Sequence, residues 1–96
     1  MYYVYVLFSK KDQHLYIGMT NDLRHRLAEH RYGLTPSTRP RRPLQLIFYE
    51  AHASRLDAVR RERYFKTSKG KATLRQMLRD TFRHLDYKGK GTGWDS

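Results

Sequence analysis

Two short apolar runs near the start of the chain constrain its fold more than any other feature. The first run covers residues 2–8 and the second covers residues 15–19, with a polar segment from Ser9 to His14 between them. Both runs are β-prone, and the segment between them is short enough to be a hairpin connection. Gly18, in the second run, permits a sharp exit or the close approach of another group. We therefore predict an N-terminal β-hairpin.

A helix is predicted to follow the hairpin directly. The segment 20–22, Thr-Asn-Asp, offers an oxygen-bearing cap and an acidic residue for the first helical turn. On the helix, Leu23 and Leu27 form the predicted buried stripe, with His30 close beside it and Arg26 on its flank. Since Arg26 and His30 are four residues apart, their side chains are expected to be neighbours on one face.

The middle of the chain predicts a third strand and a second helix. Residues 44–51 are apolar enough to form a strand that lies centrally in the sheet or against a helix. Ser54 and Asp57 resemble a capping box, which would open a helix running to about Lys69. Gly70 is predicted to end this helix. Its apolar arc is expected to contain Leu56, Ala58, Val59 and Phe65.

A third helix is predicted over residues 71–84, with an apolar stripe formed by Leu74, Met77, Leu78, Phe82 and Leu85. The sequence thus favours one α/β (α+β) domain over residues 1–85, built on a three-stranded antiparallel sheet flanked by helices. Residues 86–96 contain glycines and lysines, and we expect them to form a mobile tail. Trp94 in this tail either docks on the domain or stacks on a base.

The charge of the chain indicates its class of partner. The 96 residues include 20 Lys and Arg against 9 Asp and Glu, a net charge of +11, which attracts phosphate polyanions. Nucleic acid is the leading partner, and a membrane surface is disfavoured because the basic residues do not collect on one long amphipathic helix. We expect a cytoplasmic protein, since the chain has no cysteine, no signal-peptide pattern and no apolar run of membrane-spanning length.

A loop with all three prolines is predicted from Tyr32 to Pro43, and it contains Arg39, Arg41 and Arg42. Guanidinium groups suit bidentate contact with phosphate oxygens, so these three arginines are candidate nucleic-acid contacts. A solubilising surface loop explains the same pattern equally well.

Glu62 is out of place in the second helix, because Ala58, Val59 and Phe65 bracket it at positions three or four residues away. A buried carboxylate needs a cation or a metal ion as a partner. From the pattern alone, an ion pair with Lys66, four residues on, is the favoured explanation.

Several of these residues together resemble the GIY-YIG endonuclease family, including the N-terminal nuclease domain found in the bacterial-type excision-repair endonuclease. The second family triplet is intact as Tyr16-Ile17-Gly18, whereas the first corresponds to Tyr3-Val4-Tyr5 and departs at two positions. Arg26 and His30 match the helix positions of the family. Glu62 matches its single metal-binding glutamate.

The resemblance implies a divalent-metal-dependent endonuclease that hydrolyses phosphodiester bonds with one Mg²⁺ or Mn²⁺ ion. Glu62 would bind the metal, and Arg26 would stabilise the negative phosphorane. Tyr5 would help to activate water if nearby positive charge lowered its pKa, Tyr16 would orient phosphate or water, and His30 would relay or accept the proton. DNA is the expected substrate, recognised by structure rather than sequence, because few groups are available to read base edges.

Each candidate also has a structural explanation. Tyr5 and Tyr16 can be core aromatics paired across the hairpin, and His30 can be a satisfied core histidine. Arg26 can be a surface cation, since Arg24 flanks the same stripe on its other side. The alternative function is a non-catalytic module that binds DNA or RNA.

One further departure affects the predicted phosphate contacts. Met19 stands where some family members carry a lysine, and Lys66 or Lys69 are candidates to supply that charge. Together with Arg24, these two lysines complete the set of predicted nucleic-acid-binding residues. The sequence does not define an oligomeric state.

Overall fold

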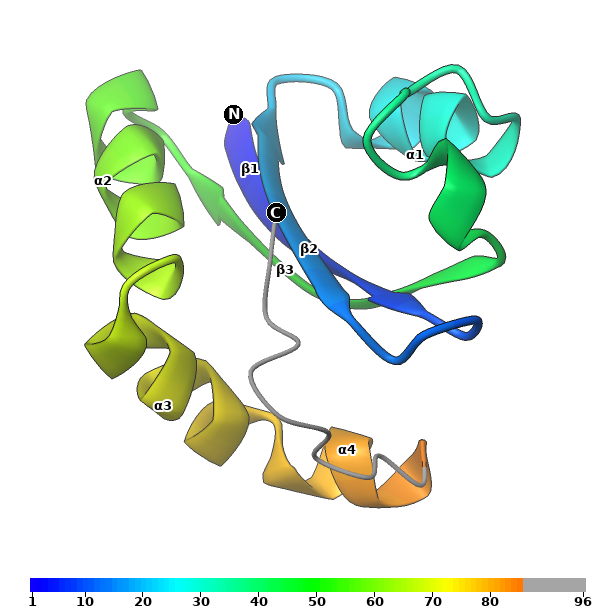
Figure 1. Ribbon diagram of the computed structural model, residues 1–96. Helices are drawn as coiled ribbons and strands as arrows, with labels where there is room; N and C mark the ends of the chain where they lie inside the picture. Colours follow the sequence, from blue (N-terminus) through cyan, green and yellow to red (C-terminus); the bar gives the residue numbers. More distant parts are fainter. Residues whose placement is uncertain (86–96) are drawn as a thin grey trace.

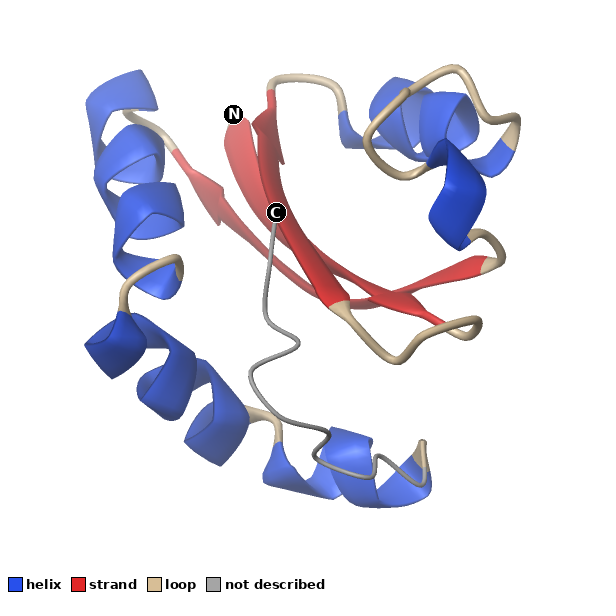
Figure 2. Cartoon of the chain, in the orientation of Figure 1, coloured by secondary structure: helices blue, strands red, loops and turns tan. Residues whose placement is uncertain are grey.

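A three-stranded antiparallel sheet divides the structure into two sides, with the first helix and a short 3-10 helix on one side and the later helices on the other (Figures 1 and 2). The computed structural model describes residues 1–85; the predicted tail, with Trp94, lies outside the described residues. In chain order the elements are β1 (Tyr2–Ser9), β2 (Leu15–Thr20), α1 (Leu23–Arg31), the short 3-10 helix η1 (Arg39–Arg41), β3 (Leu44–His52), α2 (Arg55–Phe65), α3 (Ser68–Met77) and α4 (Arg79–His84). The predicted fold class is confirmed.

β1 is the central strand, because the sheet order is β2-β1-β3. The predicted hairpin is present, with Tyr3 opposite Thr20 and Phe8 opposite Leu15. Of the two positions predicted for the third strand, the structure shows the second: β3 lies at the edge, and the ring of its Phe48 packs 6.3 Å from that of Phe65 in α2.

Successive side chains along β1 point to opposite faces of the sheet, and the two faces differ in character. One face carries the apolar core, which is covered by α2, α3 and α4. Its fully or nearly fully buried members are Val4, Val6, Phe8, Leu15, Ile17, Ala58, Phe65, Leu74, Leu78 and Phe82. The other face carries tyrosines and is only partly covered by α1, with the short η1 beside it (Figure 1). Polar chemistry is therefore placed on the α1 side.

The predicted starts of α1 and α2 are confirmed, but the acidic residue predicted for the first turn of α1 is not there, because Asp22 is itself the cap. Asp22 caps α1 and accepts a hydrogen bond through Oδ1 from the backbone N–H of His25 at 3.0 Å. Ser54 caps α2 through its hydroxyl, which accepts from the N–H of Asp57. These caps satisfy N–H groups that have no partner within the helix.

The predicted end of the second helix was wrong. α2 ends at Phe65 rather than near Lys69, and the Thr67 side chain caps a new helix by accepting from the N–H of Gly70. Gly70 therefore lies in the first turn of α3 instead of ending α2. A Cβ at this position would meet the carbonyl oxygen of Tyr64 at 1.7 Å, so glycine allows the two helices to approach closely at their corner.

The predicted third helix is interrupted at Leu78, which separates α3 from α4. Because α4 leaves in a new direction (Figure 1), Leu78 and Phe82 both stay buried, whereas Met77 is 40% exposed and its predicted core position was wrong. Leu56 was also wrongly placed in the core. It lies in the first turn of α2 and is 59% exposed, since Ala58 and Phe65 make the contact of this helix with the core.

Candidate active site

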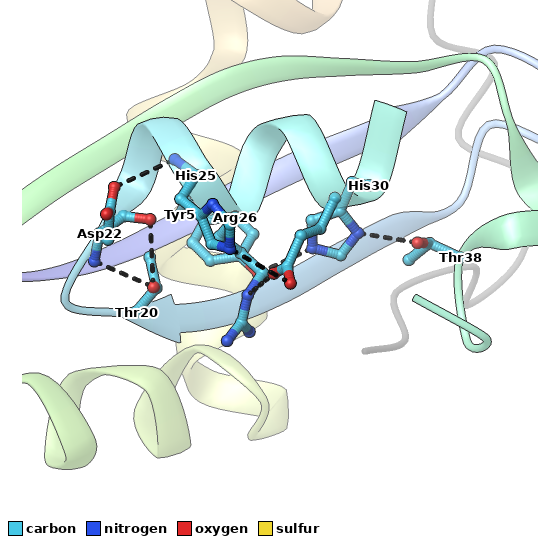
Figure 3. A network of polar contacts seen from close by, with 8 residues as sticks. Tyr5, Thr20, Asp22, His25, Arg26, His30 and Thr38 are labelled. Carbon is cyan, nitrogen blue, oxygen red and sulfur yellow. Dashed lines mark hydrogen bonds and ion pairs between the residues drawn. The ribbon is translucent and has the colours of Figure 1, made fainter. Parts of the chain in front are cut away.

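Tyr5 and His30 form a buried pair between the central strand and α1. The Tyr5 hydroxyl lies 2.9 Å from Nε2 of His30, and the two residues are 0% and 1% exposed (Figure 3). Strand alternation directs the Tyr5 side chain toward α1, and the position of His30 in the last turn of α1 brings its ring over the sheet. Two of the predicted site residues therefore meet.

Thr38 is the second partner of the imidazole. Its Oγ1 lies 2.8 Å from Nδ1 of His30, and the residue is fully buried although it belongs to the loop between α1 and β3. Sequence analysis missed Thr38. A threonine in a loop with proline, serine and arginine neighbours has no periodic pattern that would distinguish it, so its burial follows only from the folded path of the loop.

Arg26 connects this pair to the surface. Its side chain hydrogen-bonds to the Tyr5 phenol, and its Nε donates to Oε1 of Glu29 at 2.8 Å. The Arg26 side chain is 40% exposed, so part of the guanidinium remains accessible to a ligand. Of the two arginines between which periodicity left the choice open, Arg26 contacts Tyr5, whereas Arg24 lines a groove on the other flank of α1. Glu29, the residue that orients the guanidinium, was also missed, although its spacing of three from Arg26 is a recognisable helical pairing.

Tyr16 and Gly18 on β2 complete the wall beside Tyr5. The Tyr16 ring lies 6.2 Å from the Tyr5 ring and 5.2 Å from the His30 ring. Gly18 is opposite Tyr5 in the register, and a Cβ there would lie 2.5 Å from both Cζ and the hydroxyl oxygen of Tyr5. The predicted close approach at Gly18 is confirmed, and its partner is the phenol.

Burial determines the protonation of both groups in the pair. Desolvation raises the pKa of Tyr5 well above its ordinary value of 10.0; Tyr16 and Glu62 act in the same direction, and Arg26 opposes them. Desolvation also lowers the pKa of His30 from 6.5, and the charge of Arg26 adds to that effect. The expectation that positive charge lowers the Tyr5 pKa is correct for the contribution of Arg26, but burial outweighs it.

We infer one proton arrangement that satisfies every polar atom of the cluster. The phenolic oxygen accepts from Arg26, which can only donate, and the phenolic proton is then directed to Nε2 of His30. A neutral imidazole that accepts at Nε2 carries its proton on Nδ1, where it donates to Thr38. The cluster is thus a continuous hydrogen-bonded path from the half-exposed guanidinium to a buried hydroxyl.

Glu62 on α2 lies within electrostatic range of the same cluster. Its charge acts on the Tyr5 phenol, and its side chain is 23% exposed. The predicted pair with Lys66 is present, with Nζ 3.4 Å from Oε2, but the Lys66 side chain is 40% exposed and the carboxylate is not sealed. An exposed helix pair of this kind contributes only about 0.3–0.5 kcal/mol, so Lys66 does not prevent a metal ion from binding Glu62.

The chemistry of the donor set fits Mg²⁺ that keeps most of its water. A half-buried carboxylate is a hard oxygen ligand, and Mg²⁺ is commonly held by one or two carboxylates together with substrate phosphate. Within residues 1–85 no group of three His, Cys, Asp or Glu side chains is arranged to hold a metal ion. Glu62 would therefore be the protein ligand, and the remaining ligands would come from water and substrate.

The predicted phosphate-binding residues divide into exposed and inward-facing groups. Arg24, Arg39, Arg42, Lys66 and Lys69 are exposed. Arg41 turns toward the β1–β2 connection, where its side chain is 14% exposed, with Nη2 3.4 Å from the Leu15 carbonyl oxygen and Nε 3.5 Å from Oδ2 of Asp12. This placement assigns Arg41 to the hairpin connection rather than to an exposed phosphate surface.

The chain belongs to the GIY-YIG family: the family's catalytic domain matches residues 1–76. Among curated proteins it is similar to UPF0213 proteins of several bacteria. It is 40% identical over 79 residues to the one from Lactiplantibacillus plantarum, which covers 79% of this chain and 77% of that protein. Identity to the relative from Bacillus pumilus is 43% over 67 residues, covering 69% of this chain and 67% of that protein. No solved structure matches the chain significantly.

Family membership supports a nuclease domain that acts on nucleic acid. The helices between residues 1 and 85 include none that is both long and apolar enough to cross a membrane.

Proposed function

We propose that this protein is a divalent-metal-dependent endonuclease that hydrolyses phosphodiester bonds in DNA and selects its substrate by structure rather than sequence. The observation that carries the proposal is the meeting of Tyr5, Arg26 and His30 beside Glu62, from three elements of the fold. These are the residues that the family pattern assigns to catalysis, and a structural explanation of each one separately does not account for their convergence.

The residues of the cluster would divide the reaction as follows. The exposed part of the Arg26 fork binds the scissile phosphate and offsets the charge that develops on the phosphorane. A water attacks phosphorus and the bond to the 3′ oxygen breaks. The water proton passes to the phenolic oxygen of Tyr5 as Tyr5 gives its own proton to Nε2 of His30, and the 3′ oxygen takes a proton from solvent.

This relay suits the protonation of the pair. A phenol with a raised pKa is a weak base alone, but it can transfer a proton while it holds its hydrogen bond to a neutral imidazole. In the inferred proton arrangement Thr38 accepts from Nδ1–H, and this contact holds the imidazole ring with Nε2 toward the phenol. Tyr16, which is half-buried beside Tyr5, would orient the phosphate or the attacking water.

GIY-YIG nucleases generally use divalent metals, and Glu62 would hold Mg²⁺ or Mn²⁺ here. When bound, the ion would supply charge neutralisation at the phosphate and at the leaving oxygen. Since Lys66 shares the carboxylate, metal binding would compete with a weak ion pair rather than with a buried one.

A nuclease assay on duplex, single-stranded and branched DNA and on RNA, with and without Mg²⁺, tests the proposal. We expect Mg²⁺-dependent cleavage of DNA that falls at least about 100-fold in Glu62→Gln and in Arg26→Gln. Asp80→Asn is the matched control for Glu62→Gln, because Asp80 is 64% exposed on α4 and pairs with Arg83. Its cleavage rate should equal that of the wild type.

The competing function is a basic module that binds nucleic acid without cutting it. It predicts salt-sensitive retention of DNA or RNA in the presence of Mg²⁺ with no strand scission. Cleavage that persists in both Glu62→Gln and Arg26→Gln would refute the proposed site, and binding without cleavage by the wild type would favour the competing function.

A further inference from the structure

The two flanks of α1 differ in chemistry. Arg26 and His30 face β2 and the catalytic cluster, whereas Arg24 and Arg31 lie on the flank toward β3. Successive helical residues are about 100° apart, so Arg24 and Arg26 project about 200° apart around the helix axis. The flank toward β3 is not used by the proposed reaction.

A groove of about 460 Å³ runs along this second flank, between α1 and the edge of the sheet. Its floor is aromatic. Tyr49 on β3 is 52% exposed, and its ring lies 6.1 Å from the ring of Tyr3 on β1 at an angle of 59°. The exposed part of the Tyr49 ring is therefore accessible to a flat aromatic ligand from the groove.

The wall of the groove is cationic. Arg24 and Arg31 both line it, both are exposed, and within residues 1–85 neither guanidinium has an ion-pair partner. Seven residues separate them, which places them about 10 Å apart along the helix axis. Two fixed positive charges at this separation can contact more than one phosphate of an extended strand.

The basic wall continues beyond the groove. Arg31 also lines a neighbouring hollow of about 520 Å³, together with Lys11, Arg39 and Arg42. Among the residues that line this second hollow, none is acidic. Arg31 lines both hollows and therefore connects the aromatic groove to a surface that carries three further basic residues, and we refer to the two together as the track.

One acidic residue limits the track at its other end. Asp22 lines the groove at the start of α1, where its Oδ1 accepts from the N–H of His25. Its negative charge disfavours a phosphate at that end, so the backbone of a bound strand is expected to follow Arg24 and Arg31 with a base directed toward Tyr49.

We propose that this groove binds an unpaired segment of nucleic acid, with a base stacked on Tyr49 and its phosphates on Arg24 and Arg31. A basic groove with an aromatic platform is the combination that binds single strands without sequence preference. Duplex does not fit the platform, because its bases are already stacked and paired. The inference deepens the proposed function, on which its catalytic part rests: the substrate of the nuclease has an unpaired segment near the bond that is cut.

The first test measures binding in EDTA, where no cleavage can occur, by fluorescence anisotropy of labelled oligothymidylate and of a labelled duplex. We expect Tyr49→Ala to weaken single-strand binding by roughly 5- to 150-fold while duplex binding is unchanged. Tyr49→Phe keeps the stacking face and should bind as the wild type does. Tyr32→Ala is the matched control, since Tyr32 is 67% exposed and lies outside the groove.

A second measurement concerns the arginines. Arg31→Gln should weaken binding and reduce the dependence of affinity on salt concentration, because fewer counterions are released. Arg63→Gln, an exposed arginine near the end of α2, is its control. The proposal that the groove binds an unpaired strand would be overturned by either of two results. In the first, Tyr49→Ala binds the single strand as tightly as the wild type does; in the second, it loses affinity equally for single strand and duplex.

Cleavage kinetics separate this inference from the proposed function. If the wild type cuts, Tyr49→Ala should raise KM for substrates with an unpaired segment and leave kcat nearly unchanged. If KM is unchanged, the proposed role of the groove in substrate binding is wrong, whereas the proposed nuclease function is still supported by the cleavage. If the wild type binds single strands through Tyr49 but never cuts, the proposed binding of single strands by the groove is supported and the proposed nuclease function is refuted.

Discussion

The hydroxyl of Tyr5 lies 2.9 Å from Nε2 of His30, and nothing but the fold brings these residues together, since 25 positions separate them. Both side chains are almost fully buried, and the hydrogen bond between them gives the phenol a direct path for passing a proton to the imidazole. Arg26 holds the outer side of the same phenol. The same hydrogen bond therefore stabilises the buried pair and would carry the proton in the proposed reaction.

Replacement of Tyr5 by phenylalanine tests that contact. Tyr5→Phe keeps the ring but removes the hydroxyl, so we expect a loss of cleavage rate of about 100- to 10,000-fold. The protein should remain folded, with a free energy of unfolding lower by about 1–3 kcal/mol because Nε2 of the buried His30 loses its partner. Initial cleavage rates and urea unfolding measure the two effects. A Tyr5→Phe protein that cuts at the wild-type rate would exclude Tyr5 from the reaction.

The lowered pKa of His30 predicts a particular dependence of stability on pH. The folded protein keeps this imidazole neutral, while the unfolded chain takes up a proton near the ordinary pKa of 6.5. The unfolded state therefore binds more protons, and the free energy of unfolding should fall as pH drops below about 6.5, by at most about 1.4 kcal/mol per pH unit from this group.

Urea unfolding from about pH 8 down to about pH 5 measures this profile. His30→Gln should flatten it, whereas His25→Gln should not, because the His25 side chain is 71% exposed. A profile that is equally steep in His30→Gln would show that another group causes the loss at low pH.

The sequence predicted the sheet, the helix starts and the convergence of Tyr5, Arg26 and His30, because each depends on local pattern or on a family spacing. It did not predict the corner at Gly70 or the break at Leu78. Both result from contacts between helices that are packed together, such as the approach of Gly70 to the Tyr64 carbonyl. Helical periodicity continues through such positions and gives no signal of a change in direction.

The site was predicted less completely than the fold. Glu29 and Thr38 were missed, although each orients a predicted catalytic residue through a direct hydrogen bond. Thr38 illustrates the reason: its role depends on the path of a loop that returns to the end of α1, and no residue near it in the sequence specifies that path. The exposed Tyr49 was likewise interpreted as one residue of an apolar strand, since its exposure depends on how much of the sheet α1 leaves uncovered.

Substitutions of Thr38 separate the effect of its hydrogen bond on the orientation of His30 from the effect of its side-chain shape on packing. Thr38→Val keeps the shape of the side chain but leaves Nδ1–H of His30 without its acceptor, at a cost of about 1–3 kcal/mol in the free energy of unfolding. The cleavage rate should also fall, because the imidazole ring of His30 loses the contact that holds it in place. Thr38→Ser retains the hydroxyl and should recover most of the rate. Equal rates in Thr38→Val and wild type would show that Thr38 has only a structural role.

Gly18 tests whether the position of the phenol matters as much as its presence. An added Cβ would lie 2.5 Å from the Tyr5 hydroxyl oxygen, so we expect the phenol to be displaced from its contacts in Gly18→Ala. A displacement of about 1 Å in a catalytic group can cost about 100-fold in rate, and we expect a loss of that size. In a Tyr5→Phe background the same Gly18→Ala change should have little further effect on cleavage, because no hydroxyl remains to be displaced. Independent, multiplying losses of rate in the double variant would contradict this coupling and would place the effect of Gly18 elsewhere on β2.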